Sequence, residues 1–307
     1  MLEKTPAPVE LSQPADPDFS PAGLSPRTQA KVLTFANQKG GTGKTTIAQN
    51  LAICLALHYG QRVLCVDLDP QGNLSQGLSA ESVRAARTAD RLMLVPSARI
   101  SEYIIPIRPS VDLIPNRYQQ ELSTAVERLP LYGNPLRKHL SGVMTEYDYI
   151  LIDTPAGLFR ATQIGVDAAD QVMIVISSGS YALKGASALV SWMAEIHARL
   201  GKQLPLVRIV LNNYDERRRF DRELRQEVRD IFGNDLYETQ IRTSVKIVEA
   251  AARAQAVVEL PQTNPGTTDF KRLSREILGL PINVGTVANV TFAADTQSSD
   301  ARLKLVS

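Results

Sequence analysis

The sequence has few cysteines and almost no excess of charge. Of its 307 residues, two are cysteines, and 34 basic side chains nearly balance 32 acidic ones. Cys54 and Cys65 lack metal-ligand spacing and stand where small hydrophobic residues pack, so we expect buried structural thiols. A net charge of +2 is too small to indicate a polyanionic partner by itself. An argument for nucleic-acid binding therefore has to rest on local patches.

The sequence also lacks a long hydrophobic run. The apolar stretch 51–57 is far shorter than the ~18 residues that suggest a membrane span. The N-terminus carries acidic residues and prolines where a signal peptide needs a basic and then an apolar stretch. We therefore expect a cytoplasmic protein that has no membrane partner.

The organisation of the chain changes near residue 31. Residues 1–30 are rich in proline and poor in large apolar side chains, which predicts a flexible leader. From there, helical patterns such as 45–59 and 181–200 alternate with short β-rich runs. These runs are "KVLTFA", "RVLCVDLD", "VDLIP", "YDYILIDT", "QVMIVIS" and "LVRIVLNN". Near-continuous apolar strands separated by helices indicate a parallel sheet that is covered on both faces.

The segment "NQKGGTGKTT", residues 37–46, nearly fits the Walker A pattern G-x-x-x-x-G-K-[ST]. Gln38 replaces the first glycine, and Lys39 is an additional lysine beside the expected Lys44. A strand runs into this loop and a helix begins near Gly43, so backbone N–H groups and the positive end of the helix dipole face one point. The glycines let the backbone approach phosphates closely, Lys44 can reach the β- and γ-phosphates, and the Thr45 hydroxyl can ligate Mg²⁺. The residues predicted to bind the nucleotide here are Gly40, Gly41, Thr42, Gly43, Lys44, Thr45 and Thr46.

The order of strand, loop and helix favours this site over a glycine-rich turn that binds nothing. It predicts an α/β P-loop NTPase fold over residues 31–280, with a mostly parallel twisted sheet of about seven or eight strands and helices on both faces. Residues 281–307 lack sustained periodicity and are expected to form a loosely structured tail.

Carboxylates at two strand ends could complete a magnesium site. Asp153 ends the apolar run "YDYILID" and matches a Walker B carboxylate that holds Mg²⁺ through water. In "VDLDPQGN" the period of two places Asp67 and Asp69 on the same side of a strand. They lie at its C-terminal end, where ligands of open α/β sheets bind. Acids that merely cap a turn or face solvent are the alternative interpretation.

Six motifs in order, "KGGTGKTT", "DLDPQGN", "YDYILIDTPAG", "YALKGASAL", "LNNYDERR" and "SVKIVEA", are similar to those of the ParA family of partition ATPases. This family lies in the deviant Walker A group that includes MinD, and the resemblance covers about residues 31–280. It implies ATP and Mg²⁺ as cofactors and an ATP-dependent homodimer in which Lys39 reaches the phosphates of the partner subunit. A cation supplied in trans couples catalysis to assembly; a solvated loop lysine is the alternative.

The resemblance also implies roles for residues outside the loop. Asp69 would orient or activate the attacking water, Asp67 would lie closer to the metal, and Asn212 matches a position that recognises adenine in several relatives. The sequence departs from the family at "DTPAG", where "DTPPS" is usual, and at Arg242, where proline is common.

The segment 214–233 is predicted to be a helix that carries a basic ridge. Phe220, Leu224, Val228 and Ile231 form its predicted buried stripe. Arginines at 218, 222, 225 and 229 line one flank, and acids at 223, 227 and 230 line the other. From periodicity alone this could be a solvated helix face. The resemblance implies instead that double-stranded DNA is bound without sequence preference. The residues implied for this are Arg217 and Lys246, with Arg218, Arg219 and Arg222 as additional candidates.

The leading hypothesis is thus a bacterial, nucleoid-associated ATPase that segregates plasmid or chromosome DNA, stimulated by a ParB-type centromere-binding or adaptor protein. The P-loop comes too early for a preceding helix-turn-helix domain. Orphan relatives that position a protein cargo or aid conjugative transfer are the main alternative. A MinD-like membrane switch needs a C-terminal basic amphipathic helix, and "SSDARLKLVS" is too short. A reductase resembling the nitrogenase iron protein needs paired cysteines to bridge a cluster.

Overall fold

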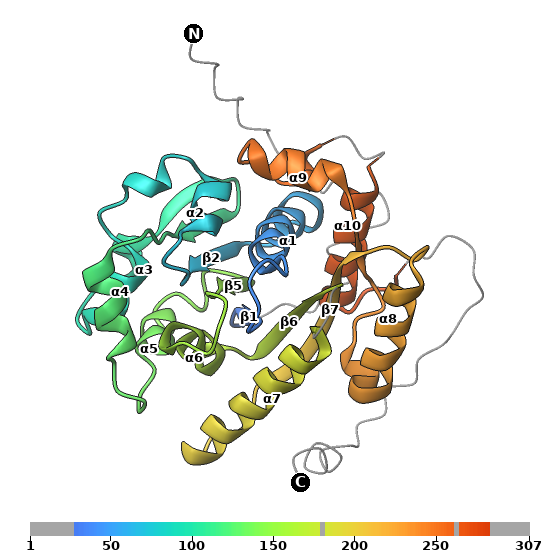
Figure 1. Cartoon of the computed structure of the whole chain (residues 1–307). Coiled ribbons are helices and arrows are strands. Elements are labelled where there is room, and N and C mark those ends of the chain that lie inside the picture. Colours follow the sequence, from blue (N-terminus) through green and yellow to red (C-terminus); the bar gives the residue numbers. More distant parts are fainter. Residues whose placement is uncertain (1–27, 179–181, 261–263, 283–307) are drawn as a thin grey trace.

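The computed structural model describes residues 28–178, 182–260 and 264–282. One sheet of eight strands crosses the middle of the molecule in the order β3-β4-β2-β5-β1-β6-β7-β8 (Figure 1). The strands are β1 (Lys31–Ala36), β2 (Val63–Asp67), β3 (Ile105–Arg108), β4 (Val111–Ile114), β5 (Tyr149–Asp153), β6 (Gln171–Ser177), β7 (Leu206–Tyr214) and β8 (Ile241–Arg242). All neighbours pair in parallel except β3, which is antiparallel to β4. The predicted α/β fold with a mostly parallel sheet is confirmed.

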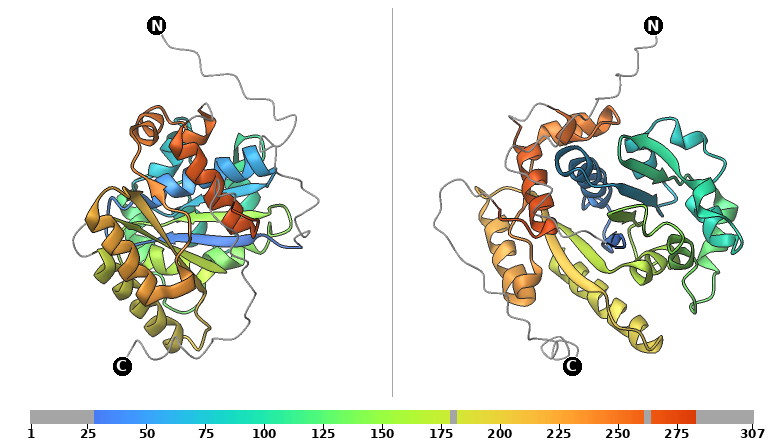
Figure 2. Two further views of the ribbon diagram at one scale, coloured as in Figure 1. Left: turned by 90° about the vertical axis from the view of Figure 1, so that its right-hand side faces the viewer. Right: turned by 180° about the vertical axis from the view of Figure 1, so that it is seen from behind.

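Helices cover both faces of the sheet. They are α1 (Lys44–Tyr59), α2 (Asn73–Leu78), α3 (Ala89–Leu94), α4 (Gln120–Glu127), α5 (Pro135–Leu140), α6 (Arg160–Ala168), α7 (Ala182–Arg199), α8 (Arg219–Phe232), α9 (Val245–Ala252) and α10 (Pro265–Leu278). Short 3-10 helices lie between them, at η2 (Ser82–Arg84), η3 (Ile100–Tyr103), η4 (Gly233–Asp235) and η5 (Val257–Glu259). Figure 2 shows α1, α9 and α10 on one side of the sheet and α7 and α8 on the other.

Alternate side chains of the strands pack into different cores. In β2, Cys65 packs with α1, while Leu64 and Val66 pack with the helices of the opposite face. Both cysteines are buried, as predicted. A fully buried aliphatic side chain contributes roughly 1.5–3 kcal/mol, so a strand buried on both faces is held firmly in place. The loops after β1, β2, β5 and β7 consequently have fixed starting points at one edge of the sheet.

Two local predictions were wrong. Strand β2 ends at Asp67, so Asp69 lies in the following loop and the period of two does not extend to it. The helix predicted from 214 begins at Arg219, and Phe220 (50%) and Ile231 (37%) are exposed. Asp221 is buried instead because it accepts a hydrogen bond from the Asp215 backbone N–H at 2.8 Å. With Leu224 and Val228 buried but Phe220 and Ile231 exposed, the buried apolar face of the helix is narrower than the sequence pattern indicates.

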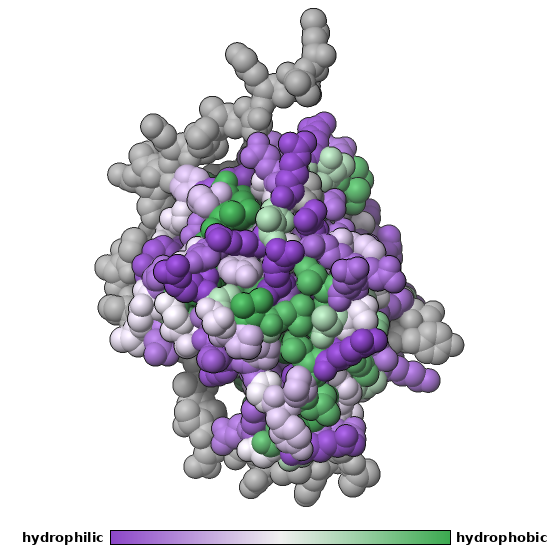
Figure 3. Space-filling model, turned by 90° about the vertical axis from the view of Figure 1, so that its left-hand side faces the viewer, coloured by the Kyte–Doolittle hydropathy of each residue, from purple (hydrophilic) through white to green (hydrophobic). Residues whose placement is uncertain are grey.

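The described part of the chain leaves out most of both termini and exposes some hydrophobic side chains. The predicted leader, 1–30, and tail, 281–307, lie almost wholly outside the described residues. None of the described helices is long and apolar enough to cross a membrane. On the face at the left of Figure 1, hydrophobic side chains gather within a mostly hydrophilic surface (Figure 3). The loops after β4, α4 and β5 also expose large hydrophobic side chains, namely Tyr118, Leu131, Tyr132 and Phe159.

Candidate nucleotide site

The loop between β1 and α1 has a backbone that depends on glycine. Gly41 (φ 74°) and Gly43 (φ 94°) adopt the left-handed conformation, which other residues rarely adopt. Gly43 is the N-cap of α1, and a Cβ added to it would lie 2.0 Å from Nδ2 of Asn212. Asn212 approaches so closely because its Nδ2 donates a hydrogen bond to the Thr42 carbonyl at 2.8 Å. The end of β7 therefore holds the loop from one side.

Asn37 ties the beginning of the same loop to β6, a role that the sequence did not reveal. Its Nδ2 donates to the Val175 carbonyl of β6 at 2.6 Å, and its Oδ1 accepts from the Lys39 backbone N–H at 2.9 Å. The Thr154 hydroxyl after β5 donates to the Phe35 carbonyl at 2.7 Å. Three strands thus fix where the loop begins. The only sequence signal for Asn37 was its place immediately before the motif.

Lys44 and Thr45, at the start of α1, lie beside Asp153, the predicted Walker B carboxylate. Lys44 is only 6% exposed, and burial lowers its pKa, against the charges of Asp153 and Asp69, which raise it. The Thr45 hydroxyl donates to Oδ2 of Asp153 at 2.6 Å. Burial raises the pKa of Asp153 well above its usual range, and the neighbouring Asp67 adds to this. A cation would favour the ionised form of this carboxylate.

The polar atoms here fit a magnesium ion. Oδ1 of Asp153 is buried without a hydrogen-bond partner, so one oxygen is left to interact with something the chain does not supply. A hydroxyl and a carboxylate oxygen are hard ligands of the kind that Mg²⁺ prefers. Among the described residues, no group of three or more His, Cys, Asp or Glu side chains could hold a metal by itself. This agrees with the habit of Mg²⁺ of keeping waters and binding together with phosphates.

Asp67 and Asp69 differ in their surroundings. Asp67 is level with Asp153 on the neighbouring strand, and burial raises its pKa to about 7. Its Oδ1 accepts from the Asp69 backbone N–H at 3.0 Å, and its Oδ2 accepts from the backbone N–H and hydroxyl of Ser75 at 2.9 and 2.6 Å. Both oxygens therefore hold the turn between β2 and α2. Asp69 is partly exposed and lines the cavity beside the loop.

That cavity has a volume of about 1020 Å³, which is ample for a nucleotide. Its walls are the P-loop, one side of α1, the residues around α2, Ala156 after β5 and the C-terminal end of α9. Lys44, Thr45 and Asp69 all face it. The Lys39 side chain is exposed, and no carboxylate of the described residues forms an ion pair with it.

The predicted basic residues lie at the other end of the same sheet edge. Arg217 and Lys246 follow β7 and β8, whose last residues, Tyr214 and Arg242, are paired after a shift in register. The Arg217 side chain is 90% exposed and pairs with Asp215, whose pKa it lowers to about 2. Lys246 pairs with Glu249 at 2.7 Å. The additional arginines also have acidic or carbonyl partners. Arg218 pairs with Asp215, Arg219 pairs with Glu223, and Arg222 donates to the Glu216 carbonyl.

A glycine-dependent anion loop, a buried lysine and a strand-end carboxylate, all on a parallel sheet, define a P-loop nucleotide-binding protein. The AAA domain family model matches residues 30–206. The chain is 33% identical over 252 residues to the chromosome-partitioning ATPase Soj of Thermus thermophilus, which covers 82% of this chain and 97% of that protein. The chain therefore belongs to the ParA/Soj family of P-loop ATPases.

Solved structures share the fold at lower identity. An ATP complex of a variant of McdA from Cyanothece is 21% identical, with a TM-score of 0.72, over 83% of this chain and 98% of that chain. Cobyrinic acid a,c-diamide synthase from Mycobacterium smegmatis, with a bound ATP analogue and magnesium, is 21% identical, with a TM-score of 0.64, over 81% of this chain and 94% of that chain. These two proteins of the same fold thus hold ATP or its analogue, the second of them together with magnesium.

Proposed function

We propose that this ATPase dimerises when it binds ATP, binds double-stranded DNA without sequence preference, and hydrolyses ATP under the control of a ParB-type partner to segregate plasmid or chromosome DNA. The observation that carries the proposal is Lys39. It stands in the phosphate loop with an exposed side chain and no ion-pair partner among the described residues. An exposed lysine beside a phosphate site, without an ion-pair partner among the described residues, is suited to contact the phosphates of a nucleotide bound by a second subunit.

Within one subunit, the chain's own groups divide the work. The P-loop N–H groups and Lys44 bind the phosphates, and Thr45 and Asp153 would hold magnesium, with Thr46 beside them at the start of α1. When bound, Mg²⁺ supplies positive charge that neutralises the phosphate oxygens. Asp69, facing the cavity, orients the attacking water. Because both of its oxygens are used in the turn, Asp67 acts by positioning Asp69 and by adding negative charge near the metal.

Asn212 would serve the base end of the nucleotide through its side-chain oxygen alone. Its amide nitrogen is already bonded to the Thr42 carbonyl. Its oxygen remains the group able to accept from an amino group such as that of adenine. We assign it two roles, which are supporting the loop and contributing this acceptor.

The DNA surface is proposed to comprise Arg217, Lys246 and the arginines 218, 219 and 222. Their present partners are the partly buried Asp215, the exposed carboxylates of Glu223 and Glu249, and the Glu216 carbonyl. The basic side chains are themselves exposed, and ion pairs of exposed side chains contribute little stability. DNA phosphates can therefore replace these partners at small cost. A two-fold dimer would present the surface twice. Binding of this kind works through counterion release, so affinity should fall steeply with salt.

The test is binding of a random-sequence DNA duplex with ATP, with ADP and without nucleotide, for the wild type, Lys39→Ala and the matched control Lys138→Ala, which changes an exposed lysine on α5. We expect retention only with ATP, loss in Lys39→Ala and no change in the control. Equal retention in all nucleotide states would overturn the ATP-dependent dimer. Absence of binding in every state would overturn DNA partition and favour the positioning of a protein cargo.

A further inference from the structure

One side of α8 borders a small hollow lined by arginines. It has a volume of about 260 Å³, and its lining residues are Tyr214, Glu216, Arg222, Arg225, Gln226 and Arg229. The arginines are spaced three and four residues apart, so they lie on one face of the helix. Tyr214 and Glu216 come from the end of β7 and the loop after it. The hollow therefore lies between α8 and the strand that leads to Arg217.

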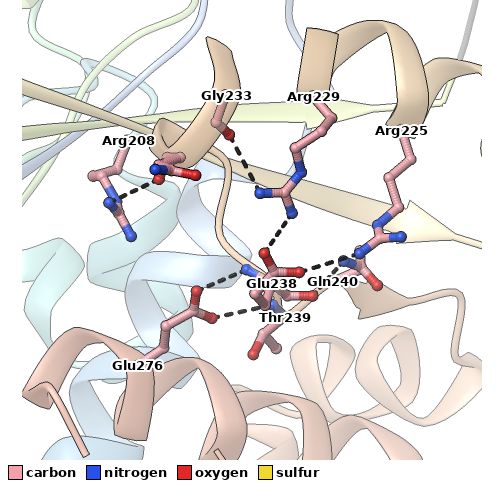
Figure 4. A network of polar contacts seen from close by, with 9 residues as sticks. Arg208, Arg225, Arg229, Gly233, Glu238, Thr239, Gln240 and Glu276 are labelled. Carbon is pink, nitrogen blue, oxygen red and sulfur yellow. Dashed lines mark hydrogen bonds and ion pairs between the residues drawn. The ribbon is translucent and has the colours of Figure 1, made fainter. Parts of the chain in front are cut away.

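The charges around the hollow do not cancel. Glu238 pairs with Arg225 at 3.3 Å and with Arg229 at 2.6 Å, as Figure 4 shows. Arg222 donates to the backbone carbonyl of Glu216 at 2.6 Å. Three arginines and one acid, Glu216, line the hollow, and Glu238 pairs with two of these arginines, so positive charge is in excess among these groups. An anion is the ligand that this excess favours.

Arg225 also has an unused donor. Its Nε is buried and forms no hydrogen bond, although a guanidinium has five N–H donors to satisfy. Leaving a buried donor without an acceptor is unfavourable. Arg229, by contrast, is used more fully, because it also donates to the Gly233 carbonyl at 3.3 Å at the end of α8. Arg225 is therefore the side chain best able to take a further acceptor.

Glu238, the partner of Arg225 and Arg229, is itself held in place by hydrogen bonds. The backbone N–H groups of Glu238 and Thr239 donate to Glu276 of α10 at 2.7 and 3.1 Å, and Arg208 donates to the Asn234 carbonyl at 3.0 Å (Figure 4). Glu238 is thus bonded to α10 through its backbone and to the arginines of α8 through its carboxylate. A site whose groups are fixed in advance loses less entropy when its ligand binds.

We propose that this hollow binds a phosphate group of the DNA backbone and so extends the DNA surface along α8. The proposal rests on the function proposed above. A guanidinium presents paired donors that match two phosphate oxygens. Tyr214 also lines the hollow, and its phenol can act as a further donor. A free phosphate ion would offer the same oxygens, and the experiment has to separate these two sources.

The experiment measures duplex affinity against salt concentration, with saturating ATP and the full chain. It compares the wild type with Arg225→Gln, with Arg225→Lys, which keeps the charge but loses the paired donors, and with Arg199→Gln. Arg199 is the matched control, because it is an exposed helical arginine paired with an acid four residues away on α7. For Arg225→Gln we expect roughly tenfold weaker binding and a log–log salt slope shallower by about 0.9, which corresponds to one lost phosphate contact. Arg225→Lys should recover part of both, and Arg199→Gln should match the wild type.

Different failures lead to different conclusions. If the wild type binds DNA with ATP but Arg225→Gln keeps its affinity and slope, the hollow is not a DNA contact and the proposed function stands. If the wild type does not bind DNA, both proposals fail. Titration calorimetry with inorganic phosphate tests whether the hollow binds a free phosphate ion. Tight phosphate binding that Arg225→Gln abolishes would assign the hollow to a free ion instead of DNA. Basal ATP hydrolysis and the circular dichroism spectrum should be the same in all variants.

Discussion

The nucleotide site and the α8 surface both gather charged side chains at one edge of the sheet, but they do so in different surroundings. At the nucleotide site Lys44, Asp67 and Asp153 are buried, and burial shifts the pKa of each. Around α8, Arg217 and Arg219 are exposed and pair with the acids Asp215 and Glu223. In the buried site, each charge that is left without a partner is costly, so one contact changes the energy strongly. On the surface each ion pair is weak, and binding depends on the sum of many of them. The buried arrangement is suited to catalysis, and the exposed one is suited to binding whose affinity depends on salt concentration.

The largest effect should come from the buried lysine. Lys44→Ala removes the positive charge that lies closest to Asp153 and Asp69, so phosphates would enter a site with uncompensated carboxylates. We expect ATP hydrolysis to fall at least ~100-fold and ATP affinity to fall with it. By comparison, Arg217→Ala should lower DNA affinity only several-fold. Single-turnover hydrolysis and fluorescent-nucleotide binding give the readouts, with Lys138→Ala as the control. Activity in Lys44→Ala within threefold of the wild type would contradict the contrast between the two regions.

The second prediction tests the packing of the loop. Gly43→Ala places a Cβ 2.0 Å from Asn212 Nδ2 at a φ of 94°. We expect more than tenfold weaker ATP binding and a loss of about 1–3 kcal/mol in the free energy of unfolding. Gly60→Ala is a matched control, because Gly60 also has a positive φ (62°) but open space around its Cβ.

Gly60→Ala should thus cost stability through backbone strain alone and leave ATP binding intact. The double variant Gly43→Ala with Asn212→Ala removes the clash and keeps the strain, so it should be intermediate in stability. If Gly43→Ala were as mild as Gly60→Ala, the close approach of Asn212 would not matter for the loop.

Sequence alone predicted the nucleotide edge well because its signals are short in range. The strand runs, the glycines of the loop and the start of α1 depend on neighbouring residues, and the structure has them where the pattern predicts. The contribution of Asn37 depends on the Val175 carbonyl, 138 residues away, which no local pattern contains. The same limit applies to α8. Its exposed Phe220 and buried Asp221 follow from the contact with Asp215, and its Arg225 and Arg229 depend on Glu238.

The third prediction concerns Arg242, the departure from the family pattern. The structure gives this departure a reason. The Arg242 backbone N–H and Nε donate to Asp269 at 3.0 and 2.9 Å, and its Nη2 donates at 2.6 Å, while Asp269 is buried on α10. Arg242→Ala leaves this carboxylate without its cation. Because the arginine side chain is itself 47% exposed, we expect a loss of about 2 kcal/mol, below the range for a fully buried pair.

Urea unfolding measures this loss, and Arg219→Ala is the comparison, since its pair with Glu223 is exposed and should not contribute measurably. ATP hydrolysis should be the same in both variants. Equal unfolding curves for the two variants would show that the pair at Arg242 is a surface pair like the others.

The smallest effect should come from Glu276, a partly buried carboxyl beneath the α8 surface. Burial raises the pKa of Glu276, against the hydrogen bonds from Glu238 and Thr239, which lower it. The folded state therefore holds this proton more tightly than the unfolded state, whose glutamate pKa is about 4.3. Between that value and the raised folded pKa the folded state binds more protons, so the free energy of unfolding falls as pH rises through this window.

Glu276→Gln cannot titrate. Its free energy of unfolding, measured in urea from pH 4 to 7, should decline less than that of the wild type, because every other group cancels in the difference. Parallel curves would mean that Glu276 behaves as a solvated acid, and the anchoring of Glu238 to α10 would then not depend on a desolvated carboxyl.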